Sequence, residues 1–317
     1  MNNMFLIALF LILFISTTYQ ADSDSTEWIG FIDSYSDNWM FTDTTATNNK
    51  LLRSDIQALV PYSLDWNYTS RRLAFISAEN NSVYIVESIE SPQMVLTPQY
   101  FRNGDTIYAI NWDSLGEGLF VHIGYRDRLE LGDISNFIFF YDFNTQQNHL
   151  IFSYNSLDYG MREFVVSPDN QYLGVTKNSV LGNEVGLISL VCIETIDIPC
   201  EYKPIGLEQW SEIAPEVGMG WSKIQWTPEG YLQFRCRDWI CVMSSDGQMA
   251  IDRIELSEYG WGDLSPTANY MAVRAQTGHL QIVNLGNGLY KTIESKRSQS
   301  KFLWITLPEA DFILEDN

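Results

Sequence analysis

The chain has 317 residues, of which 45% are hydrophobic and 14% aromatic, so it can bury a large core and is not a disordered segment. Its 40 acidic residues outnumber the 19 basic ones and give a formal net charge of −21. That charge repels phosphate backbones and anionic membrane surfaces, so we expect no nucleic acid partner. The simplest interpretation is a well-solvated surface, and the alternative is a site for Ca²⁺ or a cationic ligand.

An apolar run of 12 residues, MFLIALFLILFI, occupies positions 4–15. It is shorter than the roughly 20 residues that a membrane-spanning helix needs, and its length is typical of the hydrophobic region of a signal peptide. Small and polar residues follow, with a plausible cleavage site after Ala21. We therefore expect a signal peptide over residues 1–21 and one domain over residues 22–317. The protein would be secreted, periplasmic or at the cell surface, with no stable membrane span after cleavage. An uncleaved short anchor is the alternative.

One unit recurs along the rest of the chain: an apolar residue, a short polar turn and then a β-rich strand. Its five copies are LDWNYTSRRLAFI at 64–76, INWDSLGEGLFVH at 110–122, VVSPDNQYLGV at 165–175, IQWTPEGYLQF at 224–234 and DLSPTANYMAV at 263–273. The residues just before the turns are Trp66, Trp112, Val166, Trp226 and Leu264. A second hairpin follows each copy, so each unit predicts four strands, a to d, over about 40–50 residues, the usual length of a propeller blade.

The two ends of the chain complement each other. Residues 28–54 fit strands b, c and d with no strand a before them, whereas residues 301–313, KFLWITLPEADFI, begin like strand a and its turn. A blade completed from both ends closes the ring and removes open sheet edges. We therefore predict an all-β fold, a single β-propeller of six blades closed by N- and C-terminal strands that share one blade. Seven blades are the alternative if each end makes its own blade.

Two stretches carry a resemblance to known families. Residues 167–175 read SPDNQYLGV, which resembles the S-P-D-G-x-x-L-A-F/V repeat of TolB-like propellers. Residues 140–145 read FYDFNT, which resembles the strand and turn Y-D-L-x-T-G of WD-repeat blades. The resemblance lies at the level of the repeat and extends over residues 28–313. It implies propeller architecture and carries almost no information about activity.

The four cysteines form two close pairs, and both predicted bridges would staple hairpins in an oxidising compartment. The pairs are Cys192 with Cys200 and Cys236 with Cys241; other connectivities and buried free thiols are the alternatives. The sequons at Asn67 and Asn80 can carry glycans only in a pathway that glycosylates asparagine.

Long connections supply the predicted binding face. In a propeller, the b–c and d–a loops share one face, and here they include 124–135, 177–185 and 206–220, the last with a short candidate helix at 206–217. These loops bring charged and aromatic side chains together, as protein-binding patches do. The predicted face comprises Tyr125, Arg126, Arg128, Glu130, Asp133, Glu208, Trp210 and Glu212. Surface loops without a partner are the alternative.

No hydrolase elbow G-x-S-x-G or phosphate-binding loop occurs in the sequence, and no cofactor is evident. We expect an exported, non-catalytic propeller that binds a protein or peptide through the b–c/d–a loop face. One alternative is a Ca²⁺-dependent hydrolase or lyase of small molecules, in which three or more Asp, Asn or Glu side chains converge in the central channel. Another is a carbohydrate-binding propeller with Trp or Tyr exposed at the channel mouth.

Overall fold

A computed structural model of the chain describes residues 26–33, 35, 38–58, 64–98, 106–126, 134–156, 161–179, 182–193, 200–205, 224–236, 239–255, 262–275, 279–294 and 302–316. The apolar run at 4–15 lies outside these residues. Within them, no helix is long and apolar enough to cross a membrane.

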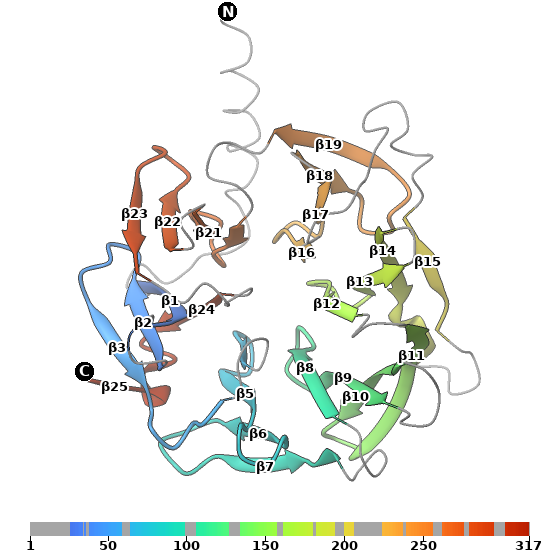
Figure 1. The fold of residues 1–317 in the computed structure, drawn as a ribbon, viewed down its shortest axis with the longest axis horizontal. Helices are drawn as coiled ribbons and strands as arrows, with labels where there is room; N and C mark the ends of the chain where they lie inside the picture. Colours follow the sequence, from blue (N-terminus) through green and yellow to red (C-terminus); the bar gives the residue numbers. More distant parts are fainter. Residues whose placement is uncertain are drawn as a thin grey trace, which may run out of the picture.

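The described strands form six antiparallel sheets arranged in a ring (Figure 1), which confirms the predicted six-bladed propeller. Strand a lies next to the central channel and strand d at the outside. From a to d, the strands of blades 1 to 3 are β4 (Leu64–Asn67), β5 (Arg72–Ile76), β6 (Val83–Val86) and β7 (Gln93–Leu96); β8 (Thr106–Trp112), β9 (Gly118–Arg126), β10 (Ile134–Asp142) and β11 (Gln147–Ser156); and β12 (Met161–Val166), β13 (Tyr172–Ser179), β14 (Gly182–Ser189) and β15 (Tyr202–Pro204). A 3₁₀ turn, η2 (Leu190–Ile193), follows β14.

Blades 4 to 6 repeat the plan, and blade 6 is made from both ends of the chain. Their strands are β16 (Ile224–Trp226), β17 (Leu232–Cys236), β18 (Trp239–Met243) and β19 (Ala250–Glu255); β20 (Gly262–Leu264), β21 (Tyr270–Arg274), β22 (Leu280–Asn284) and β23 (Tyr290–Ile293); and β24 (Leu303–Leu307), β1 (Thr26–Ile32), β2 (Trp39–Asp43) and β3 (Asn49–Leu52). After β24 come a second 3₁₀ turn, η4 (Asp311–Ile313), and β25 (Leu314–Asp316).

The predicted closure is confirmed. Strand β24 from the C-terminus pairs antiparallel with β1 from the N-terminus, with Leu303 opposite Gly30. The sequence did not predict β25, which adds a fifth strand to this blade by pairing Leu314 with Leu52 of β3. The added strand covers the outer edge of blade 6, where unpaired backbone groups would otherwise face solvent.

One predicted loop, residues 177–185, is largely strand, and the described ends of another, residues 124–135, belong to strands while residues 127–133 lie outside the described part. In residues 177–185, β13 and β14 stay paired through Asn178 opposite Asn183 and Ser179 opposite Gly182. In residues 124–135, β9 continues to Arg126 and β10 begins at Ile134. Polar residues misled the prediction because ladder hydrogen bonds join backbone groups and do not require apolar side chains. Residues 206–220, with the candidate helix, lie outside the described part of the chain.

The hydrophobic core lies between blades. Buried side chains of β5, β6 and β7 cluster with those of β8 and β9, and similar clusters join blades 2 and 3, 3 and 4, 5 and 6, and 6 and 1. Successive side chains of a strand point to opposite faces of its sheet, so strand a packs against both neighbouring blades: Ile110 of β8 belongs to the cluster with blade 1, and Ala109 packs against the cluster with blade 3.

Candidate functional site

One residue at an equivalent position in each strand a contributes to the lining of a pocket of about 450 Å³. In blades 1 to 5 this residue precedes the one that the sequence repeat places before the turn and is half-buried, whereas Leu303 of blade 6 is buried. From blade 1 to blade 6 these residues are Asp65, Asn111, Val165, Gln225, Asp263 and Leu303. The pocket is therefore built from equivalent positions in all six blades around the central channel.

The pocket reaches the a–b end of the propeller, which we define by the five a–b turns at 68–71, 113–117, 167–171, 227–231 and 265–269. Pro168, Pro228 and Pro266 from three of these turns contribute to its lining, together with Tyr68. Pro168 and Pro228 are exposed, so apolar rings stand at the mouth. Because the strands of a blade alternate in direction, the b–c and d–a connections lie at the opposite end.

Tryptophan side chains tie the pocket wall together. The indole Nε1 of Trp112 donates to the Asp65 carbonyl in the preceding blade at 3.0 Å. Trp226 donates in the same way to Val165 at 3.2 Å, and Trp304 to Asp263 at 3.2 Å. Trp304 is thus the counterpart of these tryptophans in blade 6.

Polar side chains of the pocket add further bonds around the ring. The Asp65 carboxylate accepts from the backbone N–H of Trp112 at 2.7 Å, and the Asp263 carboxylate accepts from the backbone N–H of Phe302 at 3.0 Å. The Asn111 amide donates to the Phe164 carbonyl at 3.2 Å. These three side chains therefore each bond to the backbone of the next blade. No group of three or more His, Cys, Asp or Glu that could hold a metal ion occurs in the described part of the chain.

Trp66 departs from this arrangement at the boundary between blades 6 and 1. Its indole Nε1 is buried and has no hydrogen-bond partner, although the residue lines the pocket. At the same boundary, the Tyr68 hydroxyl donates to the Trp304 carbonyl at 2.7 Å. A buried donor without a protein acceptor is usually satisfied by water or by a ligand.

The pocket is acidic as well as apolar. Asp65 and Asp263 are its two carboxylates, and no Lys, Arg or His is among its lining residues. The a–b turns add the exposed carboxylates of Glu117, Asp169 and Glu229. A cation that enters the pocket meets the carboxylates of Asp65 and Asp263 beside aromatic surface, an environment that favours cations with apolar bodies.

The residues of the predicted binding face are not among those that form this pocket. Tyr125 and Arg126 end β9, where their backbones pair with Ser135 and Ile134 at the b–c end. Their side chains lie outside the described part, as do Arg128, Glu130, Asp133, Glu208, Trp210 and Glu212. That face stays a prediction. Sequence reasoning missed the pocket, although a signal was present: polar residues precede the aligned position in four of the five copies.

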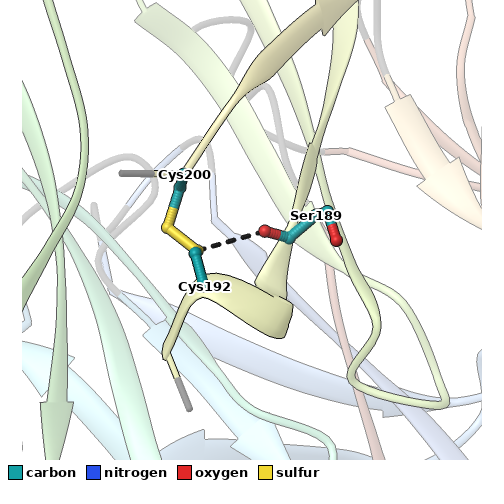
Figure 2. The surroundings of a disulfide bond; sticks show 3 residues. All are labelled: Ser189, Cys192 and Cys200. Atoms are coloured by element: carbon teal, nitrogen blue, oxygen red, sulfur yellow. Dashed lines mark hydrogen bonds between the residues drawn. A yellow bond between two sulfur atoms is a disulfide. The ribbon is translucent and has the colours of Figure 1, made fainter. Parts of the chain in front are cut away.

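The predicted bridge between Cys192 and Cys200 is confirmed (Figure 2), with 5.1 Å between the Cα atoms. It ties η2 to the segment just before β15, and Sγ of Cys192 lies 3.1 Å from the Ser189 carbonyl. Cys241 is also disulfide-bonded, whereas the side chain of Cys236 lies outside the described part. Disulfides are typical of oxidising compartments.

No protein-family model and no curated protein matches the chain. Among solved structures, the fold is similar to a chain of a nidogen/laminin complex, with a TM-score of 0.56, 10% identity and coverage of 88% of this chain and 98% of that one. It is also similar to an oligogalacturonate lyase in complex with manganese, with a TM-score of 0.51, 11% identity and coverage of 81% and 70%. A third similar structure is oligogalacturonate lyase from Vibrio parahaemolyticus, with a TM-score of 0.51, 11% identity and coverage of 87% of both chains. At these identities the similarity shows the fold alone.

Proposed function

We propose that this protein is an exported, non-catalytic propeller that binds a protein or peptide, and that its channel pocket takes an apolar, positively charged segment of that partner. One observation carries the proposal. The pocket is walled by aromatic and proline rings, holds the carboxylates of Asp65 and Asp263, and has no basic residue in its lining.

The pocket is preorganised for binding. Its wall is held by the indole bonds of Trp112, Trp226 and Trp304 and by the side-chain bonds of Asp65 and Asp263. A ligand therefore meets side chains that are already ordered, which lowers the entropic cost of association. A Lys or Arg side chain fits this chemistry, because its methylene stem packs on apolar rings while its charged head meets carboxylates.

Export is part of the proposal. The apolar run at 4–15 and the plausible cleavage site after Ala21 indicate a signal peptide over residues 1–21, followed by the propeller over residues 22–317. The bridge between Cys192 and Cys200 supports an oxidising compartment. The similarity to a chain of a nidogen/laminin complex supports a propeller that works in a protein assembly.

The competing hypothesis is a metal-dependent hydrolase or lyase, favoured by the similarity to a lyase solved with manganese. Such a site needs several oxygen ligands directed at one point. In the channel, Asp65 and Asp263 stand on either side of blade 6, and each carboxylate accepts a backbone N–H of the next blade. Each carboxylate is therefore already engaged by the next blade, and the described residues include no group of three or more His, Cys, Asp or Glu that could hold a metal ion.

Two matched peptide arrays test the proposal. One contains peptides with a single Lys or Arg flanked by Leu and Pro, and the other has Glu in place of the basic residue. We expect the purified protein to bind members of the basic array and to ignore their acidic counterparts. A double variant, Asp65→Asn with Asp263→Asn, keeps an oxygen for each backbone N–H but removes both charges. It should weaken binding about tenfold or more, as judged by isothermal titration calorimetry.

The matched control is Glu87→Gln, which removes an exposed carboxylate outside the pocket and should leave the affinity unchanged. Equal binding of acidic and basic peptides, or full affinity in the double variant, contradicts the pocket assignment. Two further arms address the alternatives. Breakdown of oligogalacturonate in the presence of Ca²⁺ or Mn²⁺ would support the lyase hypothesis, and binding of neutral oligosaccharides alone would support a carbohydrate-binding propeller.

A further inference from the structure

The chain contains two sequons, Asn67-Tyr68-Thr69 and Asn80-Asn81-Ser82, which are equivalent as sequence motifs. An N-linked glycan is attached to the side-chain nitrogen Nδ2 of the asparagine and needs open space around that atom. The fold places the two asparagines in contrasting surroundings, and this contrast decides between them.

Asn67 ends β4 and is only 4% exposed. Its Nδ2 donates to the Asp113 carbonyl of blade 2 at 2.7 Å, and its Oδ1 accepts from the Ser70 N–H at 2.7 Å. The amide therefore joins the a–b turns of blades 1 and 2 from a buried position. A sugar on Nδ2 would have to lie where blade 2 packs, so the native fold excludes it.

Asn80 lies in the b–c turn between β5 and β6 and is exposed. Its Oδ1 accepts from the Ser82 N–H at 3.0 Å, and its Nδ2 donates to the Tyr84 hydroxyl at 2.9 Å. A glycosylated amide keeps one N–H, which is enough for that bond. The exposed position therefore leaves room for a sugar on Asn80.

The next residue, Asn81, explains why Asn80 points outward. Asn81 has a φ of 54°. Its side chain turns toward blade 2, where Oδ1 accepts from the Ile107 N–H at 2.7 Å and Nδ2 donates to the Ile107 carbonyl at 3.0 Å. This pair of bonds anchors the turn to the neighbouring blade and leaves the preceding asparagine free to face solvent.

We infer that Asn80 is the N-glycosylation site of this protein and that Asn67 is unmodified in the folded chain, an inference that rests on the export part of the proposed function. The glycan lies at the b–c end of blade 1. The pocket reaches the opposite, a–b end, so the sugar leaves its mouth open and instead covers part of the face that carries the b–c connections.

The test is expression of the full chain in a eukaryotic secretory cell line, once with its own N-terminus and once fused behind a signal peptide of the host. Peptide mapping before and after treatment with peptide-N-glycosidase locates the sugar. We expect the secreted protein to carry one glycan, at Asn80, that disappears in Asn80→Gln. Asn67→Gln, the matched variant, should leave the glycan in place in whatever protein is secreted.

Secreted protein that lacks a glycan at Asn80, or that carries one at Asn67, overturns the inference. Because the fused form enters the secretory pathway in any case, its glycosylation is independent of the native leader. A native-leader form that stays in the cytosol while the fused form is secreted and glycosylated overturns the export proposal alone.

Discussion

His122 supplies a sharp test of the electrostatics of the fold. It lies on β9, is 3% exposed, and its Nε2 donates to Oδ1 of Asn136 on β10 at 2.9 Å. Its ring centroid lies 5.5 Å from that of Tyr108. Burial lowers the pKa of the imidazole from 6.5 to about 4, against a smaller raising effect of the Asn136 bond. The fold therefore holds a neutral histidine.

The sign of the pH dependence follows from linkage. Between pH 6.5 and pH 4 the unfolded chain binds a proton at His122 and the folded chain does not, so the free energy of unfolding falls as the pH falls. The contribution is fully present above about pH 6.5. A drop from pH 7 to pH 5 removes about 2 kcal/mol, and the whole shift corresponds to about 3 kcal/mol.

Urea unfolding of the wild type and of His122→Gln at pH 7, 6 and 5 measures this contribution. Glutamine keeps a donor for Asn136 and does not titrate, so its free energy of unfolding should fall by about 2 kcal/mol less than that of the wild type between pH 7 and pH 5. Carboxylates that titrate in the same range affect both proteins equally and cancel in the comparison. Parallel pH dependences of the two proteins would refute the reasoning.

Three further perturbations address the ring and its closure. Trp112→Phe removes an indole N–H that bonds the preceding blade, and should lower the free energy of unfolding by about 1–3 kcal/mol more than Trp66→Phe, whose indole has no partner; equal losses in urea unfolding would contradict this. Deletion of residues 314–317 removes β25 and uncovers the edge of β3, so the protein should stay folded but aggregate at lower concentration in light scattering; unchanged solubility would show that the strand does not protect the edge. Cys192→Ser with Cys200→Ser opens a bridge across a sequence separation of 8 and should cost about 2–3 kcal/mol by thermal unfolding, whereas an unchanged midpoint would argue against that contribution.

The local sequence pattern was sufficient to predict the blades. The unit of apolar residue, polar turn and β-rich strand recurs within short windows, so positions such as Trp66 and Trp226 could be placed at the ends of strands a before any tertiary contact was known. The bridge between Cys192 and Cys200 was predictable for the same reason, because its partners are close in sequence.

The local sequence pattern did not predict strands whose backbone pairing is independent of side-chain composition. Polar residues at 177–185 read as a loop, yet most of them continue the hairpin of β13 and β14. The strand β25 was missed because it has no counterpart in the four-strand unit and adds a fifth strand next to β3. Strand pairing depends on which backbone groups ring closure brings together, and side-chain pattern does not record that.

The sequence by itself therefore determined the architecture of this protein: repeated four-strand units, a ring closed by its two ends, and an acidic chain with a leader-like start. Only the tertiary structure decided which residues share a site. Asp65 and Asp263 are far apart in sequence and meet in one pocket because the ring brings equivalent strand positions to a common channel. The same is true of the two sequons, since packing between blades buries Asn67 and leaves Asn80 in solvent.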